Sequence, residues 1–114
     1  MNREEMERKK LMCKIVANDF VELNGAIMRT IGTAYGSRRF RVSELLLAFS
    51  GRQEGELLES LNYLEKAGYL EAIDTESKVR VEIQYAEPDE TKAILTAKGI
   101  RLVKYIETDD AVEV

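Results

Sequence analysis

Histidine is absent from this chain of 114 residues, and cysteine and proline occur once each. Without histidine, the sequence lacks both the commonest general base and the commonest protein ligand of metal ions. It also has no glycine-rich phosphate loop, no metal-ligand spacing and no pairing of a nucleophile with a base. We therefore expect no enzyme activity, no metal and no cofactor.

The single cysteine excludes an intrachain disulfide, which is typical of proteins from a reducing cytosol. Cys13 stands among apolar residues in a helical pattern, so we expect a buried thiol rather than a reactive one. No apolar run is long enough for a membrane span, and the charged start MNREEMERKK does not resemble a signal peptide. These features predict a cytoplasmic protein with no membrane partner.

Positive charge is scarce in the second half of the chain. Residues 1–50 contain nine Lys and Arg against six Asp and Glu, whereas residues 51–114 contain eight against fifteen. The two halves therefore carry +3 and −7, and the whole chain carries −4. Because a nucleic-acid-binding domain is usually basic, this balance counts against general affinity for DNA.

Apolar residues recur at spacings of three and four from residue 12 to residue 31, which predicts a helical N-terminal region. Two signals interrupt the pattern. Asp19 with Glu22 has the form of a capping box that starts a helix, and Asn24-Gly25 has the form of a helix end. The sequence leaves open whether this region is one long bent helix or two helices in series.

The rest of the chain alternates short helical and extended patterns, and it predicts an α+β fold that is mostly helical. The expected elements are a strand at 40–42, a helix from Ser43 to Gly51, a helix at 54–67 that Gly68 ends, strands at 69–73, 78–85 and 92–95, and a helix that Thr96 caps. The segment 78–85 alternates most strictly, with Val79 and Tyr85 on its expected buried face. In the last helix, Ile106 is expected on the inner side.

This order of elements resembles the winged-helix superfamily, and MarR-type small regulators in particular. The stretches that carry the resemblance are VSELLLAF, LLESLNYLEKAGYLEA and ILTAKGIRLV. Their matching residues are Leu61, Leu64, Gly68, Tyr69 and Leu70 at the end of the third helix, and Leu95, Thr96 and Gly99 at the start of the last one. The resemblance implies a three-helix core with a β-hairpin wing over residues 25–107, preceded by an extra helix at 1–24 and followed by an acidic flexible tail at 108–114.

The resemblance also implies that the helix at 54–67 enters the DNA major groove and that the wing touches the phosphate backbone. The candidate DNA contacts are Arg38, Arg39, Arg41, Arg52, Asn62, Tyr63, Lys66, Lys78 and Arg80. The expected cluster of Lys and Arg on this helix is missing, however, and Glu56 and Glu59 stand there instead. Glutamates at these positions would repel phosphate.

Two functions are therefore in competition. The first is a transcriptional regulator that binds double-stranded DNA as a homodimer, with two reading helices one DNA turn apart. Its dimer interface would use the apolar residues Leu11, Met12, Ile15 and Val16. The second is a winged-helix interaction module whose acidic third helix and wing meet a protein partner, without direct binding to DNA.

Overall fold

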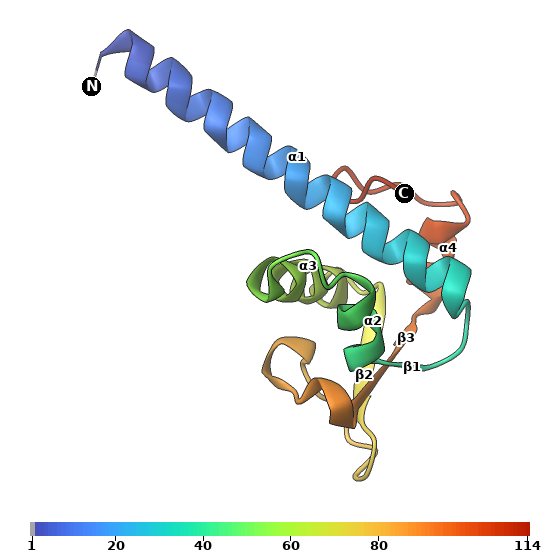
Figure 1. Ribbon diagram of the computed structural model, residues 1–114. Helices are drawn as coiled ribbons and strands as arrows, with labels where there is room; N and C mark the ends of the chain where they lie inside the picture. The colour runs from blue at the N-terminus through green and yellow to red at the C-terminus, as the bar shows by residue number, and fades with distance from the viewer. Residues whose placement is uncertain (1) are drawn as a thin grey trace.

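The structure is a computed structural model that describes residues 2–114, and its architecture is α+β (Figure 1). In chain order its elements are α1 (Arg3–Ala34), β1 (Phe40–Arg41), α2 (Val42–Ala48), α3 (Glu54–Lys66), β2 (Leu70–Asp74), β3 (Thr91–Leu95) and α4 (Ala97–Val103). Two 3-10 turns, η1 (Ile83–Tyr85) and η2 (Pro88–Glu90), lie between β2 and β3. The expected mostly helical α+β class is confirmed.

The N-terminal region is one continuous helix, α1, rather than two. Asn2 caps it by accepting a hydrogen bond from the backbone N–H of Glu5 (2.9 Å). Asn24 does not end it, because this residue is buried and its side-chain amide donates to the backbone carbonyl of Ala111 (2.9 Å). The boundary expected at residue 24 is thus wrong, since α1 continues across it into the folded body.

The first half of α1 extends away from the body as an arm, defined here as residues 3–19 (Figure 1). All residues of the arm are exposed. Cys13 is therefore exposed, and the prediction of a buried thiol is wrong because the apolar neighbours of Cys13 face solvent with it. Asp19 and Glu22 lie within the helix and do not start a new one.

The three strands form one antiparallel sheet in the order β1-β3-β2. Leu70 of β2 lies opposite Leu95 of β3, and Phe40 of β1 lies opposite Ala93 of β3. The short strand expected at 92–95 is therefore the central one. Side chains alternate along the strands, so one sheet face is buried and the other is more exposed.

The strand expected at 78–85 is wrong. In this segment only Arg80 pairs, through an isolated bridge to Ile73, across the described residues 2–114. Lys78 has a positive φ of 62°, which interrupts an extended chain. The edge of β2 that this segment would have occupied is thus left with a single bridge.

The alternating pattern at 78–85 did not predict burial either. Val79 and Tyr85, expected on a buried face, are 61% and 81% exposed. Only Ile83 of this pattern is fully buried, where η1 contacts α3. The backbone N–H of Ile83 donates to the side chain of Glu65 on α3 (3.1 Å), which fixes the turn there.

The core lies between the helices and the buried face of the sheet. Leu57, Leu61 and Leu64 of α3 are buried, as their shared helical face predicts. They meet buried residues of α1, α2, β2 and α4, including Ile27, Ile31, Leu45, Leu70 and Leu102. Burial of each such side chain contributes about 1.5–3 kcal/mol.

The helix ends confirm two predicted caps and correct a third. Gly68 follows α3 with a φ of 90°, and the Thr96 hydroxyl accepts a hydrogen bond from the N–H of Gly99 (3.0 Å) at the start of α4. Ser43 is not the N-cap of α2, because the helix starts at Val42 and Arg41 of β1 takes that position. The chain passes from strand to helix without a linking residue.

Residues 108–114, here called the C-terminal strap, pack against α1, so the expectation of a flexible tail is wrong. Val112 is buried, and the N–H of Glu113 donates to the carbonyl of Val21 (3.3 Å). Because α4 ends at Val103, Ile106 lies beyond it and is exposed rather than on the inner side.

Candidate interaction surfaces

The helix α3 exposes the side opposite its buried leucines. The residues on that side are Gly55, Glu59, Asn62 and Lys66. The first turn of the helix adds Glu54 and Glu56. The surface expected to read DNA bases is therefore present, but it holds more carboxylates than amines.

The cations of α3 and of the turn before it already have carboxylate neighbours. Lys66 Nζ lies 2.6 Å from Glu82 Oε1, and Arg52 Nε lies 3.7 Å from Glu56 Oε2. The hydrogen bond to Glu82 raises the pKa of Lys66, and the same bond lowers the pKa of Glu82. Both pairs are exposed, so each is weak, but neither cation is left unpaired for a phosphate.

Neighbouring elements cover both flanks of α3. On one flank lies η1, where burial raises the pKa of Glu65 more than its bond from Ile83 lowers it. On the other flank lies α1, where the ring of Phe20 meets the ring of Tyr63 edge-on, with centroids 5.5 Å apart. Only a narrow strip of α3 remains accessible to a partner.

Tyr63 belongs to a cluster around Asp109 rather than to an exposed surface. Its hydroxyl donates to Asp109 Oδ2 (2.9 Å), as does the hydroxyl of Tyr69 (2.6 Å). The N–H of Ala111 donates to Asp109 Oδ1 (2.8 Å). The sequence did not predict this cluster, and it turns Tyr63 away from the DNA contact proposed for it.

Ionisation in this cluster favours a charged Asp109 and neutral tyrosines. Burial alone raises the pKa of Asp109, but the bonds from Tyr69, Ala111 and Tyr63 outweigh it, so the net pKa is lowered. Burial, followed by the bond to Asp109, raises the pKa of both Tyr63 and Tyr69. The cluster has the character of a structural clasp between α3 and the C-terminal strap.

The exposed face of the sheet gathers several basic residues in one row. Arg41 lies directly opposite Lys92, Lys92 lies opposite Ile73, and Ile73 is bridged to Arg80. Arg39 precedes the inward-facing Phe40, so it lies on the same side of the strand as Arg41. We call Arg39, Arg41, Lys92 and Arg80 the basic row.

The charges of the basic row are incompletely balanced. Arg80 Nη2 lies 3.7 Å from Glu71 Oε1. Arg39, Arg41 and Lys92 form no ion pair within residues 2–114. Directly opposed like charges destabilise an antiparallel pair, so the juxtaposition of Arg41 and Lys92 has a cost that an anionic ligand would relieve.

Two further candidates have local structural roles. The guanidinium of Arg38 donates to the backbone carbonyls of Ala34 (2.9 Å) and Tyr35 (3.3 Å), which closes the C-terminal end of α1. Lys78 lies in the turn after β2, and its N–H donates to the carbonyl of Asp74 (3.0 Å). Asn62 is half-buried, with a side-chain oxygen that has no partner among residues 2–114.

The nine candidate DNA contacts therefore lie on several parts of the fold instead of forming one surface. Arg39, Arg41 and Arg80 lie on the sheet, whereas Arg52 and Lys66 belong to α3 and its preceding turn. Lys92 is the member of the basic row that the sequence did not single out. Its outward position follows from the alternation of β3, but its place beside Arg41 depends on a strand pairing between distant segments.

A groove separates α1 from α3 and continues along the side of α1. One hollow of about 140 Å³ is lined by Val16, Phe20, Glu56 and Glu59, among others. Another of about 510 Å³ is lined by Glu22, Leu23, Ala26, Arg29, Phe49, Arg52 and Glu113. Glu56 and Glu59 thus border this groove, near the root of the arm.

The four residues expected to form a dimer interface are all on the arm and all exposed. Their exposed fractions are 58% for Leu11, 59% for Met12, 46% for Ile15 and 64% for Val16. A helix with this much exposed apolar surface is characteristic of a contact with another molecule.

Among residues 2–114, no helix has the length and apolar character that crossing a membrane requires. Within the same residues there is no cluster of three or more side chains suited to hold a metal ion. Comparison of the chain with protein-family models, with curated proteins and with solved structures finds no match.

Proposed function

We propose that this chain is a winged-helix domain. The supporting observation is the order of its elements, in which a helix and a short strand precede two helices joined by a tight turn, and two strands follow. The first strand pairs with the last, in the sheet order β1-β3-β2. On this assignment α3 is the reading helix, and β2 and β3 with their connection form the wing.

The domain acts as a protein-interaction module that does not read DNA through α3. The observation that carries this proposal is the acidic character of α3, whose only basic residue, Lys66, is paired with Glu82. Phosphate contacts by Lys and Arg supply most of the affinity of DNA-binding proteins. A helix that begins with Glu54 and Glu56 and exposes Glu59 would instead repel the phosphates on both sides of a major groove.

The partner of α3 is a protein segment with basic residues. Complementary charge favours encounter between an acidic strip and a basic one, and it disfavours partners of like charge. The accessible strip of α3 is narrow because α1 and η1 cover its flanks. A single helix or extended segment therefore fits it better than a broad surface.

A DNA-binding regulator is the second candidate, and the basic row is the observation that favours it. Arg39, Arg41 and Lys92 have no ion pair within the described residues 2–114, and they lie together on the exposed face of the sheet. DNA bound there would be held by its backbone, with little dependence on sequence.

Fluorescence anisotropy of labelled duplex DNA, at low and at moderate salt, tests both candidates. The module predicts no binding by the folded protein at either salt concentration. Binding that weakens steeply with salt and is lost in Arg39→Ala/Arg41→Ala/Lys92→Ala would establish the regulator and the basic row. The matched control is Lys66→Ala, because loss of binding in that variant would mean that α3 meets DNA after all.

A further inference from the structure

We propose that the arm binds a second copy of this chain, with the two α1 helices antiparallel and in contact through one exposed face. The pairing goes beyond the proposed function, because it is independent of what α3 or the basic row binds. The sequence predicts a homodimer only from apolar residues on the N-terminal helix. The proposal adds the orientation and the register of the two helices.

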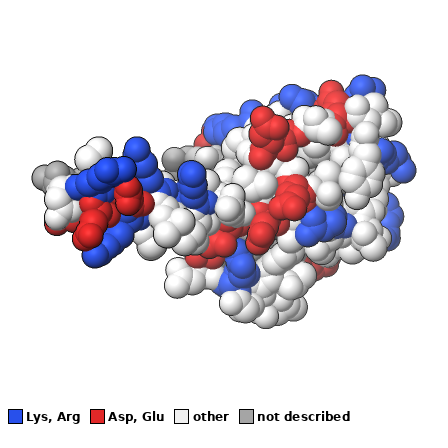
Figure 2. All heavy atoms as spheres, turned by 90° about the horizontal axis from the view of Figure 1, so that it is seen from above, with Lys and Arg blue, Asp and Glu red and all other residues white. Residues whose placement is uncertain are grey.

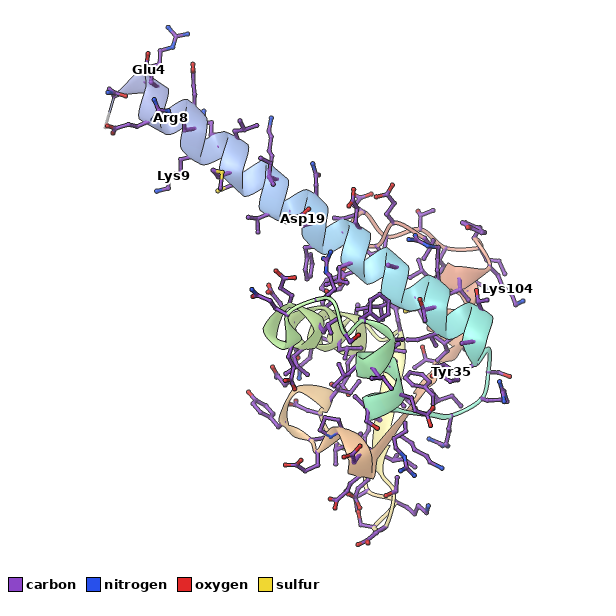
Figure 3. All side chains as sticks on the ribbon, in the orientation of Figure 1. Glu4, Arg8, Lys9, Asp19, Tyr35 and Lys104 are labelled. Atoms are coloured by element: carbon purple, nitrogen blue, oxygen red, sulfur yellow. The ribbon has the colours of Figure 1, made fainter. Side chains whose placement is uncertain are left out.

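The face that pairs runs along most of α1. Residues that follow one another at spacings of three and four share one side of a helix. On this side lie Glu4, Arg8, Ile15, Asp19, Glu22 and Arg29, which we call the pairing face, and all six are exposed. Figure 3 labels three of them, Glu4, Arg8 and Asp19, along α1.

The centre of the pairing face is apolar. Leu11 and Met12 lie within a turn of Ile15, and all three side chains are exposed. The charged members of the face lie on either side of this patch. An apolar centre with a charged rim is the usual anatomy of a protein interface.

The order of charges along the face specifies an antiparallel partner. From the N-terminus the order is negative at Glu4, positive at Arg8, apolar at Ile15, negative at Asp19 and Glu22, and positive at Arg29. When a second copy is reversed about an axis near Ile15, Arg8 of each copy lies near Glu22 of the other. In the same register Ile15 lies near itself, and Asp19 lies near Leu11. Glu4 lies opposite Ala26, about one helical turn from Arg29.

A parallel pair would place each of these charges beside its own copy. Glu4, Arg8, Glu22 and Arg29 would then all face like charges, which is unfavourable at close helix–helix distances. The antiparallel arrangement has twofold symmetry, so each favourable pair occurs twice. Charge complementarity thus distinguishes the two orientations of the same apolar patch.

The body supplies further surface for the arm of the second copy. The hollow of about 510 Å³ lies along the same side of α1, where Glu22, Leu23, Ala26 and Phe49 line it. In the antiparallel pair, the part of the second arm that precedes its own Ile15 runs over this hollow. Figure 2, which looks down on α1, shows carboxylates where the arm enters the body and most of the arm's own charges toward its free end.

Arg29 lies at the far end of this hollow. Its guanidinium donates to the backbone carbonyl of Glu113 in the C-terminal strap, and its side chain remains exposed. The strap therefore holds one cation of the pairing face in place, about one helical turn from the position that Glu4 of the other copy reaches.

The antiparallel orientation of the two helices is tested by exchanging the charges of Arg8 and Glu22 and measuring dimerisation by sedimentation equilibrium. We expect the wild type to have twice the 13.0 kDa mass of the chain at micromolar concentrations. Arg8→Glu and Glu22→Arg should each raise the dimer dissociation constant by roughly tenfold, as expected for two exposed charge pairs turned repulsive. The double variant R8E/E22R should restore the wild-type value, because attraction returns with the signs reversed.

The matched control is Lys10→Glu, which makes the same charge change two residues from Arg8, on the opposite side of the helix. It should leave the dissociation constant unchanged. Since these positions are exposed, circular dichroism should show that all variants keep their helix content.

Disulfide cross-linking in a Cys13→Ser background gives an independent test. Arg8→Cys mixed with Glu22→Cys should form a disulfide between the two variants, whereas Arg8→Cys alone should not. Two Arg8 positions are about 21 Å apart along an antiparallel pair, too far for a disulfide.

Three results would overturn the proposal. These are a monomer at all accessible concentrations, a double variant R8E/E22R no better than the single variants, or rapid cross-linking of Arg8→Cys to itself. None of these measurements involves DNA, so failure of the homodimer and failure of the interaction module are distinguishable.

Discussion

At Asp109, the hydroxyls of two distant tyrosines and the neighbouring N–H of Ala111 meet one carboxylate, and its replacement should weaken the whole fold. In Asp109→Ala the hydroxyls of Tyr63 and Tyr69 lose their acceptor. We expect the free energy of unfolding in urea to fall by about 1–3 kcal/mol. The control is Asp110→Ala, where an exposed neighbour is removed and a change below about 0.5 kcal/mol is expected. Equal losses in the two variants would show that the clasp is unimportant.

The same cluster should make stability depend on acidic pH. Since the pKa of Asp109 is lower in the folded protein than its ordinary value, the folded state favours the charged carboxylate. Its contribution is complete above the unfolded pKa of about 3.9 and is lost as the pH falls through the lower folded pKa. At pH values below about 4, the urea concentration at the unfolding midpoint should therefore decrease with decreasing pH. This decrease should be less steep in Asp109→Ala. Identical acid profiles for both proteins would contradict this assignment.

Two glycines in helices should respond in opposite ways to alanine. At Gly25 an added Cβ would overlap the carbonyl oxygen of Glu113, so Gly25→Ala should displace the C-terminal strap and destabilise the fold. At Gly55 no atom lies near the added Cβ, and Gly55→Ala should stabilise α3 by roughly 0.5–1 kcal/mol. Urea unfolding of both variants checks the signs. A stabilised Gly25→Ala would mean that the strap does not pack on α1.

At the scale of elements, the arm should leave Cys13 accessible in the native protein. Cys13 is exposed, and it lies on a different side of α1 from Ile15 and the pairing face. A thiol reagent should modify it about as fast in native buffer as in urea. A rate that is much slower in native buffer would mean that another part of the protein, or a second copy, covers that side of the arm.

The elements that could be predicted from the sequence are those whose signals are local. The leucine face of α3, the cap at Thr96 and the left-handed Gly68 each depend on a few consecutive residues, and all are confirmed. The strictly alternating segment 78–85 was the clearest strand signal, and it is wrong. The segment forms a single bridge to one edge of β2, whereas β2 pairs along its other edge with β3. Alternation shows which residues suit a strand but not which strand they pair with.

The features of the candidate site that were missed depend on distant contacts. Asp109 looked like part of a solvated acidic tail, since nothing near it in the chain indicates that Tyr63 and Tyr69 lie beside it. Asn24-Gly25 also predicted a helix end that does not exist. Asn24 instead donates a hydrogen bond to the strap, and the missing side chain of Gly25 lets the backbone of the strap pass close to α1. In both cases a tertiary contact determines the role of the residue, and the local sequence pattern predicted a different role.

At the scale of the whole molecule, the arm determines the shape. The protein measures 56 × 31 × 23 Å, and its long dimension reflects a helix of 32 residues that is only half covered by the body. In the proposed homodimer, contact between the two arms would stabilise this helix more than its own helix propensity does. The body contributes the acidic α3, and the sheet carries the basic row.

The most direct test of the central claim, that α3 does not meet DNA, locates any contact residue by residue. Backbone amide chemical shifts of the labelled protein would be followed by NMR during titration with duplex DNA at low salt. The account predicts no change at Gly55, Glu59, Asn62 and Lys66, whether or not the basic row responds. Saturable shifts at these four residues, absent with a neutral polymer of similar size, would contradict it and identify α3 as a DNA-reading helix.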